Sequence, residues 1–172
     1  ITSLFQGGIG LPDRDYYINT DERSLGIQQA YITHIGNMFK LLGDQPEVAE
    51  KKAKVVYDIE ANLAKASMTQ IELRDPQAQY NKKTMQELTA LTSDLQLNTY
   101  LESINIKISR SVPPAEKSDY AEAIRMDGIS HVIVGQPEFF KELNKDMKSV
   151  SIADWKTYLR WTLVNRSAAK LS

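Results

Sequence analysis

Both tryptophans of this chain lie in one stretch, Asp154-Trp155-Lys156-Thr157-Tyr158-Leu159-Arg160-Trp161. Apolar residues recur around it at steps of about three and four, which is the spacing of a broad apolar face on a helix over residues 150 to 163. Ser151 can cap this helix, and Asp154 places a carboxylate at its positive end. The face consists of Val150, Trp155, Tyr158, Leu159, Trp161 and Leu163. Since large aromatic residues are mostly buried, we expect the rest of the chain to pack against this helix.

The composition is that of an ordinary globular protein. The chain has 172 residues, of which 42% are hydrophobic and 25% charged, and this is enough for one domain with its own core. A net charge of -1 gives no electrostatic reason to expect nucleic acid as a partner. No apolar run approaches the roughly 20 residues that cross a bilayer, so we expect no membrane span in this segment.

The chain contains no cysteine, which removes disulfides, thiolate nucleophiles and cysteine-based metal sites together. It begins at Ile1 without a basic and apolar leader, so we expect it to be cut from a longer protein.

The expected fold is mainly α, an irregular helical lobe with one short strand or small β-element near residues 131–135. Residues 1–18 are an irregular entry segment, because Gly7, Gly8, Gly10 and Pro12 interrupt regular structure. Residues 19–172 form the helical lobe. Its expected helices cover residues 19–42 (capped by Asn19), 46–67, 84–92 (with a capping box from Thr84 to Glu87), 98–104, 118–126 and 136–147, with an extended connection over 106–114.

The sequence offers no catalytic, cofactor-binding or metal-binding residues. His34 and His131 lie in unrelated contexts, and neither has a second ligand at helical spacing. A nucleophile elbow and a phosphate-binding glycine loop are also absent. Asn165 begins a glycosylation sequon, which matters only in a eukaryotic secretory context.

Two charged motifs have two interpretations each. Arg14 and Asp15 precede a pair of tyrosines, and Arg74 and Asp75 come shortly before Asn81. The arginines can anchor loops through carboxylates or backbone carbonyls, or they can contact a substrate or another lobe. We favour loop anchors.

Five motifs together resemble one family. They are Gly8-Ile9-Gly10-Leu11-Pro12-Asp13-Arg14-Asp15-Tyr16-Tyr17, Ile59-Glu60-Ala61-Asn62-Leu63-Ala64, Arg74-Asp75-Pro76 with Tyr80-Asn81-Lys82, Val132-Ile133-Val134-Gly135-Gln136-Pro137-Glu138-Phe139-Phe140, and Trp155-Lys156-Thr157-Tyr158-Leu159-Arg160-Trp161. In this order they resemble the N-terminal half of the neprilysin (M13) family of zinc metallopeptidases, which includes endothelin-converting enzymes and bacterial PepO-type oligopeptidases.

The resemblance implies that this segment is the helical lid lobe of a zinc metalloendopeptidase that cleaves oligopeptides. In that family the lobe faces the catalytic lobe of the same polypeptide across a cavity that admits peptides and excludes folded proteins. The zinc ligands lie further downstream, so the resemblance implies no cofactor in this chain and no peptidase activity of the chain alone. The lack of cysteine departs from the mammalian members and points to a bacterial relative, exported to the periplasm or displayed outside the cell on its surface.

Two alternatives remain open. The chain can be a stand-alone helical module that binds peptides or proteins without catalysis. It can also be an unrelated small enzyme that uses carboxylates such as Glu60 or Asp127, which would require a buried pair of carboxylates in a cleft.

Overall fold

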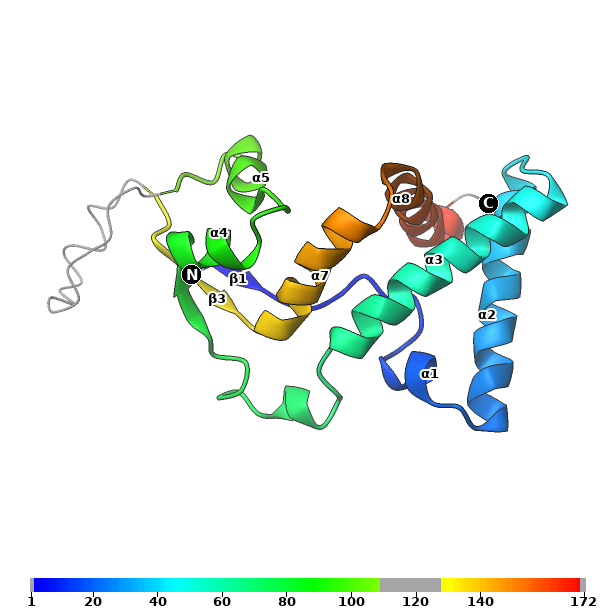
Figure 1. Ribbon diagram of the computed structural model, residues 1–172, viewed down its shortest axis with the longest axis horizontal. Helices are drawn as coiled ribbons and strands as arrows, with labels where there is room; N and C mark the ends of the chain where they lie inside the picture. Colours follow the sequence, from blue (N-terminus) through cyan, green and yellow to red (C-terminus); the bar gives the residue numbers. More distant parts are fainter. Residues whose placement is uncertain (1, 109–127, 171–172) are drawn as a thin grey trace, which may run out of the picture. The chain divides into compact units, whose positions relative to one another are not determined.

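The computed structural model describes residues 2–108 and 128–170 and is mainly helical, with one small sheet (Figure 1). This confirms the expected fold class. The expected helix over 118–126, most of the extended connection, and Asp127 lie outside the described residues. The helices are α1 (Asp15–Ile18), α2 (Glu22–Leu41), α3 (Pro46–Ala66), α4 (Met85–Leu91), α5 (Leu97–Ser103), α7 (Pro137–Ser149) and α8 (Ile152–Ser167), with 3-10 turns at Glu72–Arg74 and Ala168–Lys170.

The chain divides into two compact units. The first combines Ile1–Gln6 with Ile71–Met147, and the second combines Gly7–Gln70 with Lys148–Ser172. Each unit is thus built from segments that are distant in the sequence.

The first unit is organised around a three-stranded sheet in the order β1-β3-β2. The central strand β3 (His131–Val134) runs parallel to β1 (Thr2–Leu4) and antiparallel to β2 (Lys82–Thr84). Val132 and Val134 of β3 are fully buried, as expected for a short β-branched strand. The expected strand is confirmed. Strand β1, within the entry segment, was not expected, because three residues become a strand only through a partner about 130 positions away.

The capping box predicted for α4 is confirmed. The hydroxyl of Thr84 accepts a hydrogen bond from the backbone N–H of Glu87 at 3.2 Å, and the Glu87 carboxylate accepts one from the backbone N–H of Thr84 at 2.7 Å. This reciprocal pair satisfies two N–H groups that the helix itself leaves without partners.

The second unit is a helical hairpin, α2 and α3, with α8 packed on α3 and α1 at one end. One apolar face of α3 is buried, at Ala49, Ala53, Val56, Ile59 and Leu63. Trp161 of α8 is 2% exposed and has ring contacts with Tyr31, His34 and Phe39 of α2. Within the second unit, α8 therefore packs against α3 and contacts α2 through Trp161.

Local hydrogen bonds define both ends of α2, and the predicted N-cap is wrong. Gly43 ends the helix, with φ +94° and the paired bonds Gly43 N–H to Lys40 O and Asp44 N–H to Phe39 O. The N-cap is Asp21 instead of Asn19. Asn19 already serves as the C-cap of α1, where its N–H donates to Asp15 O.

Helix α8 is confirmed together with its cap, since the Ser151 hydroxyl accepts from the Asp154 N–H at 3.1 Å. Its expected single buried face is wrong at two positions. Tyr158 and Trp161 are buried, whereas Leu159 and Leu163 are 59% and 68% exposed. Apolar residues surround much of this helix, so their spacing could not indicate which side is covered.

In the part of the chain that the structure describes, every helix is too short or too polar to cross a membrane.

Gly26 inside α2 and Gly43 just after its end give a matched stability test. Gly26 lies inside the helix, where an added Cβ meets no atom within 4 Å, so Gly26→Ala should stabilise the fold by roughly 0.5–1 kcal/mol. Gly43 has a positive φ, so Gly43→Ala should destabilise it by about 1 kcal/mol. Urea unfolding of both variants measures these opposite signs, and a stabilising Gly43→Ala would contradict a requirement for glycine at this positive φ.

Candidate functional site

A buried carboxylate, Glu60 of α3, is the centre of the second unit. It is 2% exposed. Its Oε2 accepts hydrogen bonds from the Tyr17 hydroxyl at 2.6 Å, the Tyr31 hydroxyl at 2.9 Å and the backbone N–H of Gly10 at 3.2 Å. The Trp161 indole N–H donates to the Tyr31 hydroxyl oxygen at 3.2 Å. Glu60 thus links the Gly10 loop, α1, α2 and α8 through one cluster, which we call the Glu60 cluster: Gly10, Tyr17, Tyr31, Glu60 and Trp161.

The same cluster shapes the glycine-rich loop before α1. The Tyr17 hydroxyl oxygen accepts from the N–H groups of Gly10 and Leu11, at 3.1 and 2.9 Å. The Tyr158 hydroxyl donates to Gly8 O at 2.7 Å. Gly8 has φ +86°, and a Cβ there would lie 2.6 Å from the Tyr158 hydroxyl oxygen, so only glycine fits. The irregular loop is therefore specified by contacts to buried tyrosines.

Burial dominates the electrostatics of the Glu60 cluster. It raises the pKa of Glu60, although the hydrogen bonds from Tyr17 and Tyr31 lower that pKa in part. Burial, followed by the neighbouring Glu60 charge, also raises the pKa of both Tyr17 and Tyr31 above the ordinary value. The carboxylate is surrounded by donors and has no second carboxylate among its described partners. This arrangement suits a structural clamp better than an acid–base pair.

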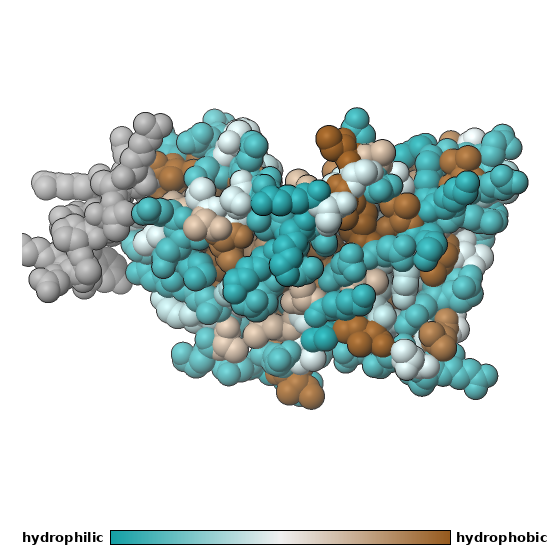
Figure 2. Space-filling view, viewed as in Figure 1, coloured by the Kyte–Doolittle hydropathy of each residue, from teal (hydrophilic) through white to brown (hydrophobic). Residues whose placement is uncertain are grey.

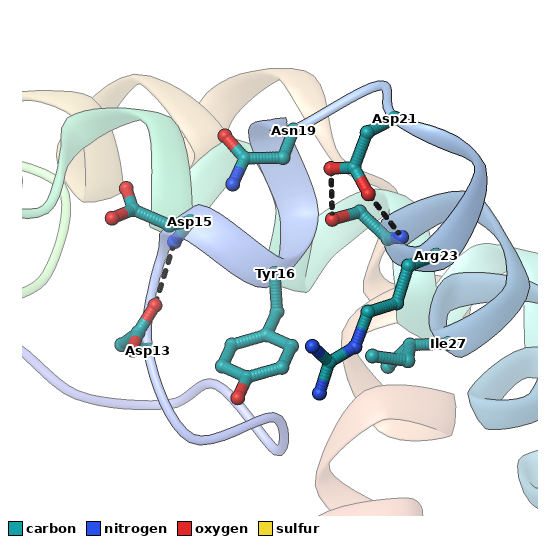
Figure 3. Close-up of a pocket in the computed structure, with 8 residues that line it drawn as sticks. Asp13, Asp15, Tyr16, Asn19, Asp21, Arg23 and Ile27 are labelled. Atoms are coloured by element: carbon teal, nitrogen blue, oxygen red, sulfur yellow. Dashed lines mark hydrogen bonds between the residues drawn. The ribbon is translucent and has the colours of Figure 1, made fainter.

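A small hollow lies beside α1 and the start of α2, with a volume of about 320 Å³ (Figure 3). Its lining residues are Asp13, Asp15, Tyr16, Asn19, Asp21, Arg23, Ser24 and Ile27. Two of its carboxylates are used locally: Asp13 accepts from the Asp15 N–H at 2.9 Å, and Asp21 accepts from the Ser24 hydroxyl, which lowers the pKa of Asp21. The hollow is thus bordered by turn and cap residues.

The described residues hold no group of three or more histidine, aspartate or glutamate side chains placed to bind a metal ion. His34 instead packs edge-on against the ring of Trp161, and the His131 Nδ1 lies 2.9 Å from the Ser130 hydroxyl. The two histidines belong to different units. The described histidine, aspartate and glutamate side chains therefore do not fit a zinc centre.

Arg14, one of the expected anchor residues, lies between α1 and the end of α3. Its Nη1 donates to the carbonyl of Ser67 at 2.8 Å, and its Nε lies 3.9 Å from an Asp15 carboxylate oxygen. Ser67 is the C-cap of α3, where a positive charge is favourable. Asp15 itself is 54% exposed.

The second charged motif lies in the first unit, and Arg14 lies in the second. Asp75 accepts from the backbone N–H of Gln77 at 2.9 Å, which closes a turn. Asn81 donates to Ala78 O at 2.9 Å and Gly135 O at 3.4 Å, joining this loop to the end of β3. Arg74 is exposed, and no described residue bonds its guanidinium.

Sequence reasoning missed the Glu60 cluster. Tyr17 and Tyr31 lie 43 and 29 positions from Glu60, so no local spacing connects them. The available signal was a glutamate within the apolar stripe of α3, next to Ile59 and one turn before Leu63 and Ala64. A charge at such a position requires buried partners.

Two substitutions of Glu60 distinguish the contribution of its charge to stability from the contribution of its hydrogen bonds. Glu60→Ala leaves the hydroxyls of the buried Tyr17 and the half-buried Tyr31, and the Gly10 N–H, short of an acceptor, and we expect a loss of roughly 3 kcal/mol. Glu60→Gln keeps an acceptor and should lose less. Urea unfolding at several pH values measures both variants.

The same variants test the raised pKa of Glu60. Because the folded state holds this proton more tightly than the unfolded chain, stability should fall as pH rises from about 4.3, the unfolded value, through the folded pKa. Glu60→Gln has no such titration, so the unfolding free energy of the wild type should fall relative to that of Glu60→Gln as pH rises through that window. A difference independent of pH would contradict the assignment.

The two arginines provide a matched pair. Arg14→Ala removes a charged hydrogen bond to Ser67 O and should cost about 1.5 kcal/mol, whereas Arg74→Ala should change stability by less than about 0.5 kcal/mol. Thermal unfolding of the two variants measures the contrast. Equal shifts in Tm would show that the Ser67 contact does not anchor the loop.

The comparison with protein families gives a match over the whole chain. The model of the N-terminal region of peptidase family M13 matches residues 1–172. This agrees with the five motifs identified in the sequence.

Individual relatives are similar at moderate identity. An endothelin-converting enzyme homologue of Locusta migratoria is 27% identical over 179 residues, covering 100% of this chain and 22% of that protein. Human endothelin-converting enzyme 1 is 25% identical over 174 residues, covering 99% of this chain and 20% of its own length. The chain thus spans about a fifth of these relatives.

Solved structures share the fold. The zinc metalloprotease ZMP1 of Mycobacterium tuberculosis in its open state superposes with a TM-score of 0.80 at 26% identity, over 99% of this chain and 23% of that one. The inhibitor complex of ZMP1 gives a TM-score of 0.76 at 26% identity, over 94% of this chain and 22% of that one. With all 172 residues matched by the family model, the chain belongs to peptidase family M13.

Proposed function

We propose that this chain forms the helical lid lobe of a zinc metalloendopeptidase that cleaves oligopeptides. The observation that supports this most strongly is the match of the M13 N-terminal model to every residue of the chain. The chain spans about a fifth of its relatives, and its described residues do not fit a zinc centre. Zinc would therefore be held by other parts of the polypeptide, and the 172 residues alone would be inactive.

In this proposal the lobe walls the substrate cavity and limits substrate size. A wall that excludes folded proteins has to be stiff, and the Glu60 cluster supports this role because it ties α1, α2, α3 and α8 to one buried carboxylate. The partners of the lobe would be the catalytic lobe of the same polypeptide and the peptide substrate.

The charged motifs would have separate tasks. Arg14, bonded to Ser67 O, would anchor the loop before α1. Arg74, exposed and without a described partner, would be available for a contact between lobes, with Asp75 and Asn81 fixing the turn that carries it. Asp15, exposed at the small hollow, would also be available for a contact between lobes. We place the protein in the periplasm or outside the cell on its surface, on the resemblance to exported bacterial members.

Substrate size gives the test. The same cleavable sequence is presented to the full-length protein as a free oligopeptide and within a loop of a folded protein. We expect kcat/KM to be at least about a hundredfold lower for the folded protein, equivalent to ~2.7 kcal/mol in transition-state binding. A chelator should abolish cleavage and added zinc restore it, while residues 1–172 alone cleave neither substrate.

An unrelated protease with an open active site is the control, and should cleave both presentations at similar rates. Equal cleavage of both substrates by the full-length protein would contradict the size limit. Cleavage by residues 1–172 alone would contradict the assignment of catalysis to another lobe.

A further inference from the structure

Helix α8 is apolar on two sides. Its inner side carries the buried Tyr158 and Trp161. Its outer side carries Ile152, Leu159 and Leu163, which are 75%, 59% and 68% exposed. Steps of seven and four residues align these three side chains along one line of a helix. Figure 2 shows hydrophobic side chains at the molecular surface over α8.

The outer side of α8 is also cationic. Lys156 lies on the same line, one turn after Ile152, and is exposed. Arg160 and Arg166 flank the line, and the acidic residue of α8, Asp154, is engaged with the Ser151 cap at the beginning of the helix. A surface that covers this side well would be apolar along its middle and acidic at its margins.

A second exposed apolar group lies in the same unit, at the turn between α2 and α3. Leu41 is 81% exposed, and Leu42 and Val48 are also exposed. Arg160 approaches Asp44 of this turn to 3.9 Å, which brings the turn next to α8. Grouped exposed leucines of this kind mark a surface that another surface covers.

We propose that the outer side of α8, formed by Ile152, Lys156, Leu159 and Leu163, docks against an apolar and acidic surface of the remainder of the same peptidase polypeptide. This rests on the proposed function. The relatives are about five times as long as the segment they share with this chain, so most of each polypeptide remains to supply that surface. A surface tethered in the same molecule has a high effective concentration, which favours it over a second copy or a lipid bilayer.

Thiol protection in the full-length protein tests the docking. The 172 residues contain no cysteine, so Leu163→Cys introduces a single thiol reporter in this segment. Maleimide labelling of the unsubstituted full-length protein is measured as the background and subtracted. We expect maleimide to label it roughly tenfold or more slowly than the control Lys54→Cys, whose side chain is 74% exposed on α3, with both rates scaled to those in urea. Leu159→Cys is a second reporter should Leu163→Cys fail to fold.

Each outcome decides the proposal. Equal labelling of Leu163→Cys and Lys54→Cys would overturn it. Protection that disappears on dilution would assign the surface to a second copy of the protein. Protection that appears only with anionic phosphatidylglycerol vesicles would assign it to a membrane. Either result overturns the proposal. Peptide cleavage by the unsubstituted protein is measured in parallel. Free labelling in an active peptidase refutes the docking alone, and protection in an inactive protein refutes the proposed function alone.

Discussion

The second unit depends on the hydrogen bonds that converge on the Glu60 carboxylate. A charged group that is 2% exposed is unfavourable unless donors surround it, and here two tyrosine hydroxyls and a backbone N–H do so. The donors come from separate segments, so satisfying one carboxylate fixes the loop, α1 and α2 against α3. The Trp161 indole extends the same constraint to α8. Local sequence forms the helices, but this buried charge determines how they are joined.

The parts of the fold that follow from neighbouring residues could be predicted from the sequence. The capping box at Thr84, the cap at Ser151 and the glycine stop at Gly43 each need only residues within one turn, and all three are present. Asn19 shows the limit of this reasoning. Asn19 and Asp21 can both cap α2, and the choice is made by α1, which uses Asn19 as its own end.

The parts that depend on distant partners could not be predicted. Strand β1 exists because it pairs with β3, and Arg14 meets the end of α3 at Ser67, 53 positions away. Four members of the Glu60 cluster lie in three of the motifs, and Tyr31 lies in none of them, so the motifs suggested the family but not the contacts. The motifs around Tyr17, Glu60 and Trp161 meet at the cluster. Arg14 and Arg74 are each followed by an aspartate in the sequence, yet they lie in different units and have different neighbours.

The exposure of leucines on α8 is a consequence of the same cluster. Turning the helix to bury Leu159 and Leu163 would expose Trp161 and Tyr158 and would break their hydrogen bonds to Tyr31 and Gly8. Aromatic side chains bury more area than leucines, and the two hydrogen bonds add to the preference for the observed orientation. The inner side therefore fixes the helix, and turning the helix cannot bury the outer apolar side without exposing these aromatic residues. A stripe that its own fold cannot cover is best explained as a surface for another part of the polypeptide.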